Sequence, residues 1–177
     1  MRNQAKIIFQ NIYCVPVTET HIDKGWLTWM NDPITSQQIN KEGRKFKKID
    51  LENYLKEKNS IFFLACYTKE GEYFANVRIH EWTSNIACFG RLIGLKKNRG
   101  KGYGKLLVEL SKSLIFDYTK YDIIIAGNNK SDLASAKSKI KSGFQKIDKK
   151  TKNALNIEFK DGEYYILNRT DYYKSFI

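Results

Sequence analysis

The sequence predicts an α/β fold of the α+β kind, in which a mixed, mostly antiparallel central sheet contains one βαβ crossover. Three observations lead to this prediction. Strand-like runs separated by short turns fill residues 60–95, as expected of an antiparallel meander. A glycine-rich basic loop at 99–104 then leads into a leucine-rich segment with helical spacing. The apolar run at 121–127 suits a buried parallel strand, joined to the meander by a right-handed crossover.

The N-terminal part is expected to hold a strand region and a helix. Residues 6–17 are rich in Ile, Val and aromatic side chains and predict strand. Residues 20–33 carry apolar side chains at near-helical spacing, with Thr20 as a candidate N-cap and Pro33 as the stop. The polar, basic segment 34–48 predicts a loop or an irregular helix.

The middle of the chain is expected to be a short helix followed by the meander. The helix spans 50–58 and has Asp50 as its candidate cap. The strands of the meander are expected at residues 60–68, 72–82 and 86–95. Short turns separate these strands, so neighbours in sequence can pair in antiparallel fashion.

The second half is expected to alternate strands and helices. Its expected elements are a helix at 103–120, a parallel strand at 121–127, a helix at 131–144 and a hairpin at 154–170. Gly143 ends the second of these helices as a C-cap. Asp161 and Gly162 supply the turn of the hairpin, because Asp-Gly favours a two-residue turn.

Length and composition predict a single domain over residues 1–177. Hydrophobic residues make up 42% of the chain and aromatic residues 14%, which is enough to build a core. No apolar run approaches a membrane span and the N-terminus lacks a signal-peptide pattern, so a cytoplasmic protein without a membrane partner is expected. The three cysteines are widely spaced and form no CxxC pair, which predicts free buried thiols and no metal site.

The formal charge of +12 predicts an anionic partner or simply a solvated surface. Lysines are scattered along the whole chain, which favours a solvated surface. Attraction of a phosphate-bearing cofactor or substrate fits equally well. Nucleic acid is not expected as a partner, because aromatic and basic residues do not interleave as on a base-stacking surface. A homodimer is compatible with the sequence.

The segment 99–105 has the properties of a phosphate-binding loop. Glycines let a backbone approach phosphates closely, and the first N–H groups of a helix lack intrahelical partners. The alternating glycines are Gly100, Gly102 and Gly104, and the basic side chains are Arg99, Lys101 and Lys105. The spacing matches neither Walker A nor GxGxxG, so these two phosphate motifs are excluded.

The segment Arg99–Gly104 also carries a family resemblance. It matches the Arg/Gln-x-x-Gly-x-Gly/Ala signature of the GCN5-related N-acetyltransferase (GNAT) superfamily, and the expected elements resemble that family in their order over nearly the whole chain. Gly143-Phe144 resembles the Gly-Phe pair that often follows the family's last helix. The segment WLTWMNDP resembles a branch that acts on amino sugars and on ribosomal protein N-termini.

The resemblance implies a GNAT-like fold and acetyl-CoA as the cofactor. The loop backbone from Arg99 onward would hold the pyrophosphate, and the preceding strand would bond the pantetheine arm. A separation between this strand and the strand at 121–127 would admit the thioester. The cofactor contacts implied in this way are Leu92, Ile93, Gly94, Arg99, Gly100, Lys101, Gly102, Tyr103, Gly104, Lys105 and Asn128.

Acetyl transfer to an amine needs a proton acceptor for the amine, and two neighbouring residues are candidates. Glu81 is preferred and His80 is the alternative, both near the end of one strand. Successive side chains of a strand face opposite ways, so at most one of them points into a site. The other histidine, His21, is expected on a helix surface.

A proton donor for the leaving thiolate is harder to assign. The resemblance places a tyrosine in many family members where this sequence has Lys139. A different branch uses a serine that follows an asparagine by three, which fits Ser131 after Asn128. Counting back from Gly143-Phe144 indicates Ser135 instead, so both serines are kept, with Ser131 ahead; capping or solvent exposure explains either one equally well.

The predicted function is an acetyl-CoA-dependent N-acetyltransferase that acts on a primary amine. The expected acceptor is a small molecule such as an amino sugar, and the basic charge would suit one linked to a nucleotide. Two alternatives are kept, namely acetylation of a protein or ribosomal N-terminus and a non-catalytic acyl-CoA-binding protein. The non-catalytic alternative is kept because Lys139 stands where many family members have a tyrosine.

Overall fold

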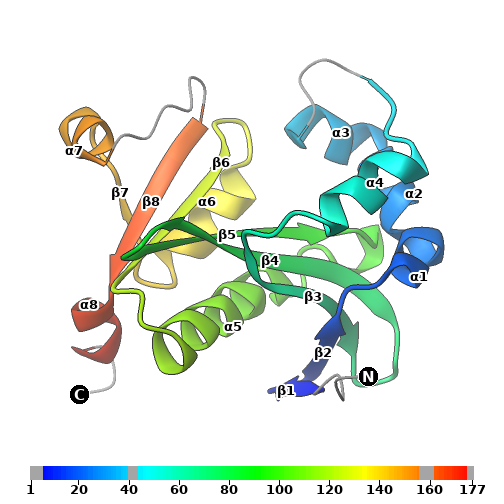
Figure 1. Cartoon of the computed structure of the whole chain (residues 1–177), viewed down its shortest axis with the longest axis horizontal. Helices are drawn as coiled ribbons and strands as arrows, with labels where there is room; N and C mark the ends of the chain where they lie inside the picture. The colour runs from blue at the N-terminus through cyan, green and yellow to red at the C-terminus, as the bar shows by residue number, and fades with distance from the viewer. Residues whose placement is uncertain (1–5, 40–43, 156–161, 175–177) are drawn as a thin grey trace. The chain divides into compact units, whose positions relative to one another are not determined.

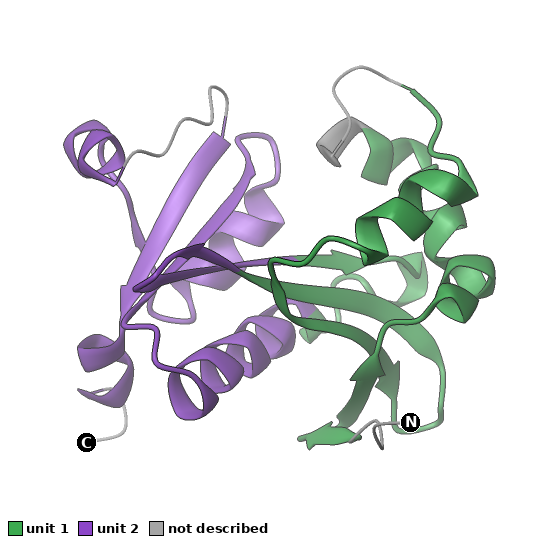
Figure 2. Cartoon of the chain, in the orientation of Figure 1, with its two compact units in different colours: residues 1–80, 91–103 green, residues 81–90, 104–177 purple. Residues whose placement is uncertain are grey.

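The computed structural model describes residues 6–39, 44–155 and 162–174. The chain forms two compact units, one of residues 1–80 and 91–103 and the other of residues 81–90 and 104–177 (Figure 2). In the described part, eight strands follow the order β1-β2-β3-β4-β5-β6-β8-β7 (Figure 1). Strands β4 and β5 run through both units, so the sheet is continuous along the chain.

The structure confirms the mixed, mostly antiparallel sheet. The strands are β1 (Ile7–Phe9), β2 (Ile12–Pro16), β3 (Ser60–Thr68), β4 (Tyr73–Thr83), β5 (Ile86–Ile93), β6 (Ile123–Asn129), β7 (Gln145–Lys146) and β8 (Gly162–Asn168). The β1–β2, β2–β3, β3–β4, β6–β8 and β7–β8 pairs are antiparallel, and β5–β6 is parallel. Helix α5 (Tyr103–Tyr118) connects β5 to β6, which makes the expected βαβ unit.

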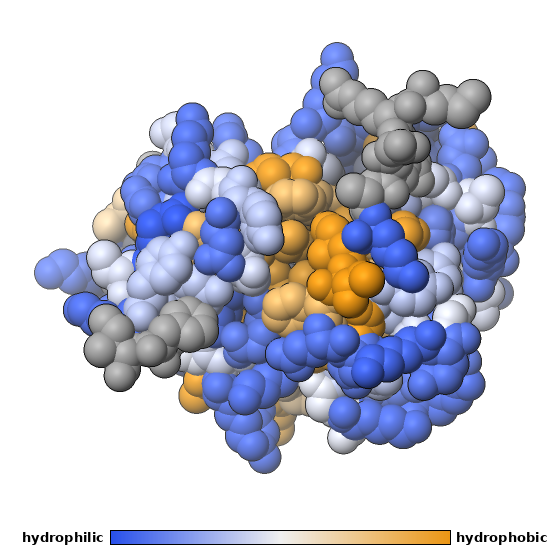
Figure 3. Space-filling view, turned by 90° about the horizontal axis from the view of Figure 1, so that it is seen from below, coloured by the Kyte–Doolittle hydropathy of each residue, from blue (hydrophilic) through white to orange (hydrophobic). Residues whose placement is uncertain are grey.

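The remaining helices are short. They are α1 (Glu19–His21), the π-helical η1 (Ile22–Trp26), α2 (Leu27–Met30), α3 (Pro33–Ile39), α4 (Lys48–Leu55), the 3₁₀ turn η2 (Lys96–Asn98), α6 (Leu133–Ile140), α7 (Lys149–Ala154) and α8 (Arg169–Lys174). No helix in the described ranges is long and apolar enough to cross a membrane. Figure 3 shows hydrophilic residues over much of the face in view, in keeping with lysines scattered along the chain.

Three expectations for the N-terminal helices were wrong in detail. The predicted continuous helix is kinked at Gly25, whose φ is 143°. It is capped by Thr18 rather than Thr20. Pro33 begins α3 instead of stopping a helix, because the N–H groups of the next two residues donate to Asp32 Oδ1, each at 3.2 Å. Proline suits the first position of a helix, where its missing N–H costs nothing.

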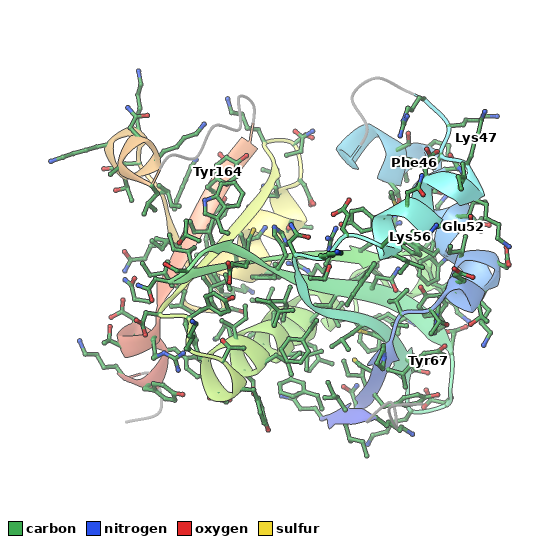
Figure 4. All side chains as sticks on the ribbon, viewed as in Figure 1. Phe46, Lys47, Glu52, Lys56, Tyr67 and Tyr164 are labelled. Carbon is green, nitrogen blue, oxygen red and sulfur yellow. The ribbon has the colours of Figure 1, made fainter. Side chains whose placement is uncertain are left out.

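Two more polar residues have other roles than expected. Lys47 is the N-cap of α4 (Figure 4). Asp50 is the third helical residue, and its carboxylate accepts the Lys47 N–H at 2.7 Å. His21 is buried rather than on the surface, and its Nε2 lies 2.9 Å from Tyr67 Oη of β3. His21 therefore links the C-terminal end of α1 to strand β3.

The core of the first unit is aromatic. Trp26, Trp29 and Tyr73 are buried together in it, with Ile22, Leu51 and Ala65. The core of the second unit includes aliphatic side chains from the apolar stripe of α5 and from strand β6, namely Leu107, Leu110, Ile115, Ile124 and Ile125, all buried. Cys14, Cys66 and Cys88 are free thiols on three strands; Cys14 and Cys66 are buried as expected, whereas Cys88 is half-buried.

Most of the first strand of the predicted C-terminal hairpin lies outside the described residues, and only the second strand is confirmed. Residues 149–154 form α7, which begins after Asp148, whose carboxylate accepts the Thr151 N–H at 2.7 Å. Residues 156–161, which hold most of the expected strand and Asp161, lie outside the described residues. Strand β8 is confirmed, but in the described part it pairs with β6 and β7, and Arg169 already begins α8.

Candidate functional site

The glycine loop is built for close approach by a ligand. Gly100 and Gly102 have φ values of 75° and 86°, a conformation that side chains other than glycine rarely adopt. A Cβ on either residue would have no other heavy atom within 4 Å, so the space above both is open. The loop ends where the 16-residue α5 begins, and the first N–H groups of a helix attract anions.

The side chain of Arg99 is held in place by hydrogen bonds within the protein. Its Nε donates to Ile93 O at 3.2 Å, and its Nη2 lies 3.1 Å from Thr35 Oγ1 and 3.5 Å from Gly94 O. Thr35 is 2% exposed. The Arg99 side chain therefore braces the loop against the end of β5 and α3, which leaves its backbone as the part open to a ligand.

The other loop cations are exposed. Lys101 and Lys105 make no ion pair with any side chain in the described ranges, whereas Lys97 pairs with Glu72. Lys97 and, more weakly, Lys101 lower the pKa of the Glu72 carboxyl. Positive charge at the start of α5 is thus available to an anion chiefly from Lys101 and Lys105.

The first residues of α5 fasten the loop to the sheet. The Tyr103 ring lies against the Phe74 ring of β4, with their centroids 4.6 Å apart. Gly104 is half-buried and follows it in the helix. The ring of Tyr103 is therefore engaged with β4, while its backbone belongs to the start of α5.

The end of β5 is largely occupied by contacts within the protein. The Leu92 side chain packs on the aromatic core, and the Gly94 N–H donates to Phe74 O at 2.9 Å. Ile93 offers its carbonyl to Arg99. Of the residues expected to bond a pantetheine arm, Gly94 therefore has its N–H already in use.

Strand β6 has an edge that β5 does not cover. The parallel register joins Ile86, Ala87 and Cys88 to residues 123–125, and no further pair with β5 occurs among the described residues. On its other edge β6 pairs with β8 over all seven residues, Ile123 to Asn129. Within Ala126–Asn129, every second residue therefore directs its backbone groups to a free edge, to which an extended ligand can bond as a strand does.

Three polar residues meet beside that free edge. Lys139 of α6 is 2% exposed, and its Nζ lies 2.7 Å from Asn128 Oδ1 and 2.8 Å from Ser135 Oγ. Ser131 lies apart from them in an exposed turn, where its N–H and Oγ both lie 3.2 Å from Asn129 Oδ1. The structure thus brings Asn128 and Ser135 together through the lysine, and gives Ser131 a local contact in the turn.

The two candidate proton acceptors differ in their surroundings. Glu81 is exposed, and its carboxylate accepts a hydrogen bond from Tyr121 Oη, a bond that raises the pKa of Tyr121. His80 is half-buried, and its buried Nδ1 has no hydrogen-bond partner among the described residues. Burial, with the charge of Arg78, lowers the pKa of His80, so its ring is neutral at pH 7.

Sequence reasoning missed two of these contacts, Lys139 with Ser135 and Arg99 with Thr35. Ser135 and Lys139 are four apart on one helix, a spacing that brings side chains together and was a readable signal. Thr35 is 64 residues from Arg99, and nothing local in the sequence indicates their contact. In the described ranges, no group of three or more His, Cys, Asp or Glu side chains is placed to hold a metal ion.

Comparison of the sequence with protein-family models gave no match, and neither did comparison with curated proteins. Solved structures do match. The GNAT-family acetyltransferase from Bacillus anthracis aligns with a TM-score of 0.75 and 16% identity, covering 94% of this chain and 99% of that chain. Spermidine N-acetyltransferase from Vibrio cholerae, solved with CoA and spermine, aligns with a TM-score of 0.75 and 11% identity, covering 92% and 98%.

A third match is the aminoglycoside acetyltransferase AAC(6')-Ib, solved with ribostamycin and coenzyme A. Its TM-score is 0.78 at 17% identity, covering 94% of this chain and 98% of that chain. Identity is low in all three matches, but the aligned part is nearly the whole of each chain. The chain therefore has the fold of the GNAT-family acetyltransferases, as the resemblance of its Arg99–Gly104 segment implied.

Proposed function

We propose that this chain is an acetyl-CoA-dependent N-acetyltransferase and that residues 1–177 act as one domain. The observation that carries the proposal is the loop at Gly100 and Gly102, with its left-handed backbone, open space and helix start. Solved proteins of the same fold contain coenzyme A and match across both units of the chain. An anion-binding loop in this fold is best explained by the pyrophosphate of CoA.

The proposed cofactor contacts follow the chain. Backbone N–H groups from Arg99 to Gly104 would hold the pyrophosphate, and Lys101 and Lys105 would add charge. The free edge of β6, within Ala126–Asn129, offers backbone groups for the amides of the pantetheine arm. Leu92 and Ile93 of β5 remain cofactor contacts predicted from the sequence. Bound there, acetyl-CoA supplies an activated acetyl group as a thioester.

The chain's own residues would then serve the transfer of that acetyl group. The acceptor nitrogen must lose a proton as it bonds to the carbonyl carbon, and His80 is our first choice for the acceptor of this proton. Its support is the buried Nδ1 without a partner in the described chain, since unsatisfied buried polar atoms often mark functional sites. Glu81 is the second choice, because its carboxylate already has Tyr121 as a partner.

The acceptor is proposed to be a small molecule with a primary amine. Spermidine N-acetyltransferase was solved with spermine, and AAC(6')-Ib with ribostamycin. This protein has a formal charge of +12, so it repels polycations of that kind. An amino sugar linked to a nucleotide is negatively charged through its phosphates and is attracted instead. A panel of spermine, an aminoglycoside, a nucleotide-linked amino sugar and a peptide with a free N-terminus separates these acceptors.

Calorimetric titration with acetyl-CoA tests the cofactor claim. Wild-type protein should bind, and Gly102→Glu should abolish binding, because it adds a negative side chain and strains the backbone. Gly71→Glu is the matched control, since Gly71 has the same φ of 86° in the β3–β4 turn. Absence of binding by the wild-type protein, or equal effects of both variants, would contradict the proposal. Binding without CoA release across the panel would identify a non-catalytic CoA-binding protein.

A further inference from the structure

Cys14 of β2 and Cys66 of β3 form a pair of buried thiols that the proposed function does not use. Both side chains are 0% exposed. The two strands lie side by side and run antiparallel (Figure 1), and Cys14 is directly opposite Cys66 in their register. Cys14 Sγ donates a hydrogen bond to Cys66 Sγ, with the two sulfur atoms 3.1 Å apart. The two thiols therefore face each other across neighbouring strands.

The backbone at this pair suits a disulfide bond. Residues directly opposite each other in an antiparallel pair have Cα atoms about 4.5–5.5 Å apart. Disulfides join cysteines whose Cα atoms are about 4.4–6.8 Å apart. From their separation of 3.1 Å, the sulfur atoms need to approach by about 1 Å to reach the length of an S–S bond. The bond can therefore form chiefly by rotation of the two side chains, with little movement of either strand.

Two other uses of the pair fit less well. A structural zinc ion almost always takes four ligands, and in the described ranges no third Cys, His, Asp or Glu side chain completes a metal-binding group here. A thiol that reacts singly needs a low pKa and access to solvent. Burial, with the hydrogen bond and charge of Cys14 acting in the same direction, raises the pKa of Cys66 instead. The pair is therefore suited to a reaction between its own sulfur atoms.

A bond between these sulfur atoms would close a long loop of the first unit. The two cysteines are 52 positions apart in the sequence. In its described part, the segment between them holds helices α1, α2, α3 and α4. Closing a long loop restricts the unfolded chain and so stabilises the folded state. Cys88, the third cysteine of the chain, belongs to β5 and to the second unit, so it serves as an internal control.

We propose that Cys14 and Cys66 are a redox modification site, at which hydrogen peroxide converts the two thiols into an intramolecular disulfide. The sulfur of one thiolate attacks a peroxide oxygen and the O–O bond breaks, which gives a cysteine sulfenic acid and water. The second sulfur attacks the sulfenic sulfur, the S–O bond breaks, and another water molecule leaves. The thiols lose two electrons and two protons, which reduce one peroxide to two water molecules. This inference is independent of the proposed acetyltransferase function.

Peptide mapping of oxidised protein tests the pairing. Folded wild-type protein is treated with hydrogen peroxide, then unfolded, alkylated and digested, and its peptides are identified by mass spectrometry. The peptides of Cys14 and Cys66 should be joined, with the loss of two hydrogen atoms, and Cys88 should be alkylated. Protein unfolded in urea before oxidation is the control and should give a mixture of pairs. A cross-link to Cys88 in folded protein, or no cross-link between Cys14 and Cys66, would overturn the proposal.

Two variants make the mapping specific. Cys14→Ala removes one sulfur atom of the pair, so Cys66 should remain available for alkylation after peroxide treatment. Cys88→Ala is the matched control, because it removes a thiol outside the pair and should keep the cross-link. Loss of the cross-link in folded Cys88→Ala would overturn the proposal. Wild-type protein and Cys88→Ala give this decision even if Cys14→Ala fails to fold.

Thermal unfolding measures the consequence of the bond. Oxidised wild-type protein should melt roughly 5–15 °C above the reduced protein, because the cross-link restricts the unfolded chain. Reduction with dithiothreitol should reverse this rise. Cys66→Ala should melt at the same temperature before and after peroxide treatment. A cross-linked wild-type protein that melts below its reduced form would show that the two sulfur atoms are not placed for the bond, and would overturn the proposal.

Discussion

The indole of Trp29 occupies the space where a side chain on residue 94 would lie. A Cβ on Gly94 would be 1.7 Å from Trp29 Cδ2, and one on Gly25 would be 3.2 Å from the same indole. Trp29 also packs on Tyr73, with ring centroids 4.4 Å apart. Two glycines far apart in the sequence therefore make room for one tryptophan in the core of the first unit.

Gly94→Ala should consequently destabilise the protein. An added methyl group cannot fit without moving the indole, and overpacking a core costs about 1–3 kcal/mol of unfolding free energy or more. Urea unfolding measures the loss. Gly90→Ala is the control, because a Cβ on that residue of β5 meets no heavy atom within 4 Å. Equal stability of the two variants would contradict the packing argument.

Substitutions of Arg99 and Lys101 should have different effects, the first mainly on stability and the second mainly on acetyl-CoA binding. Arg99→Gln removes the donor of Ile93 O and Thr35 Oγ1, so we expect a loss of about 1–3 kcal/mol, the cost of leaving buried acceptors unpaired. Lys101→Gln, at an exposed side chain, should leave stability within about 0.5 kcal/mol and weaken acetyl-CoA binding several-fold at low salt. Urea unfolding measures the stability of both variants, and calorimetry measures their affinity for acetyl-CoA. An equal loss of stability in both variants would contradict the different roles of Arg99 and Lys101.

Local patterns predicted the parts of the fold that depend on local chemistry. Glycines at 100 and 102 favoured a loop with positive φ, and the leucines spaced along residues 103–118 favoured helix α5. Each of these signals depends only on residues close together in the sequence. The apolar run before Asn128 indicated a buried parallel strand, and it pairs with β5 as expected. The loop, its helix and the strand after it could thus be placed from the sequence.

What failed depended on competing local signals or on distant contacts. A proline such as Pro33 can end a helix or begin one. Here it begins α3, because the Asp32 carboxylate accepts an N–H group of the first turn. The hydrogen bond that anchors Arg99 was not predicted, because its partner Thr35 is distant in sequence. In the sequence, Lys139 stands only as the residue that replaces the tyrosine of many family members. The structure adds that its Nζ contacts Asn128 and Ser135. The conformation of the glycine loop could therefore be predicted from the sequence, whereas the contacts of Lys139 could not.

Both histidines should make stability depend on pH. Burial lowers the pKa of His21 and of His80 below the unfolded value of 6.5. The unfolded state then binds more protons than the folded state below pH 6.5, so unfolding free energy should be full above that pH and fall as pH decreases through it. Carboxyl groups with lowered pKa act only below about pH 4.5, so their effect is separate.

Urea unfolding at pH 7.5, 6.5 and 5.5 measures this dependence. His80→Gln should reduce the slope, and adding His21→Gln should remove most of the remainder, because the chain has only two histidines. The slopes are compared rather than the absolute values, since His21→Gln also loses the contact with Tyr67. A slope that persists in the double variant would place the titrating group elsewhere.

His80 and Glu81 should differ in what their removal does to catalysis. Glu81 is tied to Tyr121, which precedes Ala126 on the free edge of β6 by five residues, or roughly 16 Å of extended chain. We therefore expect Glu81→Gln to change kcat/KM by less than about threefold, and His80→Gln to lower it by roughly 10²-fold or more. Because the pKa of His80 is lowered, the activity of wild-type protein that depends on this base should persist down to a pH below 6.5.

The pH profile of kcat/KM with one acceptor tests this difference. Wild-type protein and Glu81→Gln should share one acidic limb, and His80→Gln should lose the component that belongs to the neutral imidazole. The acceptor amine adds its own limb, which is the same in all three proteins and therefore cancels in their ratios. Loss of activity in Glu81→Gln with a normal profile in His80→Gln would assign the proton acceptor to the carboxylate instead.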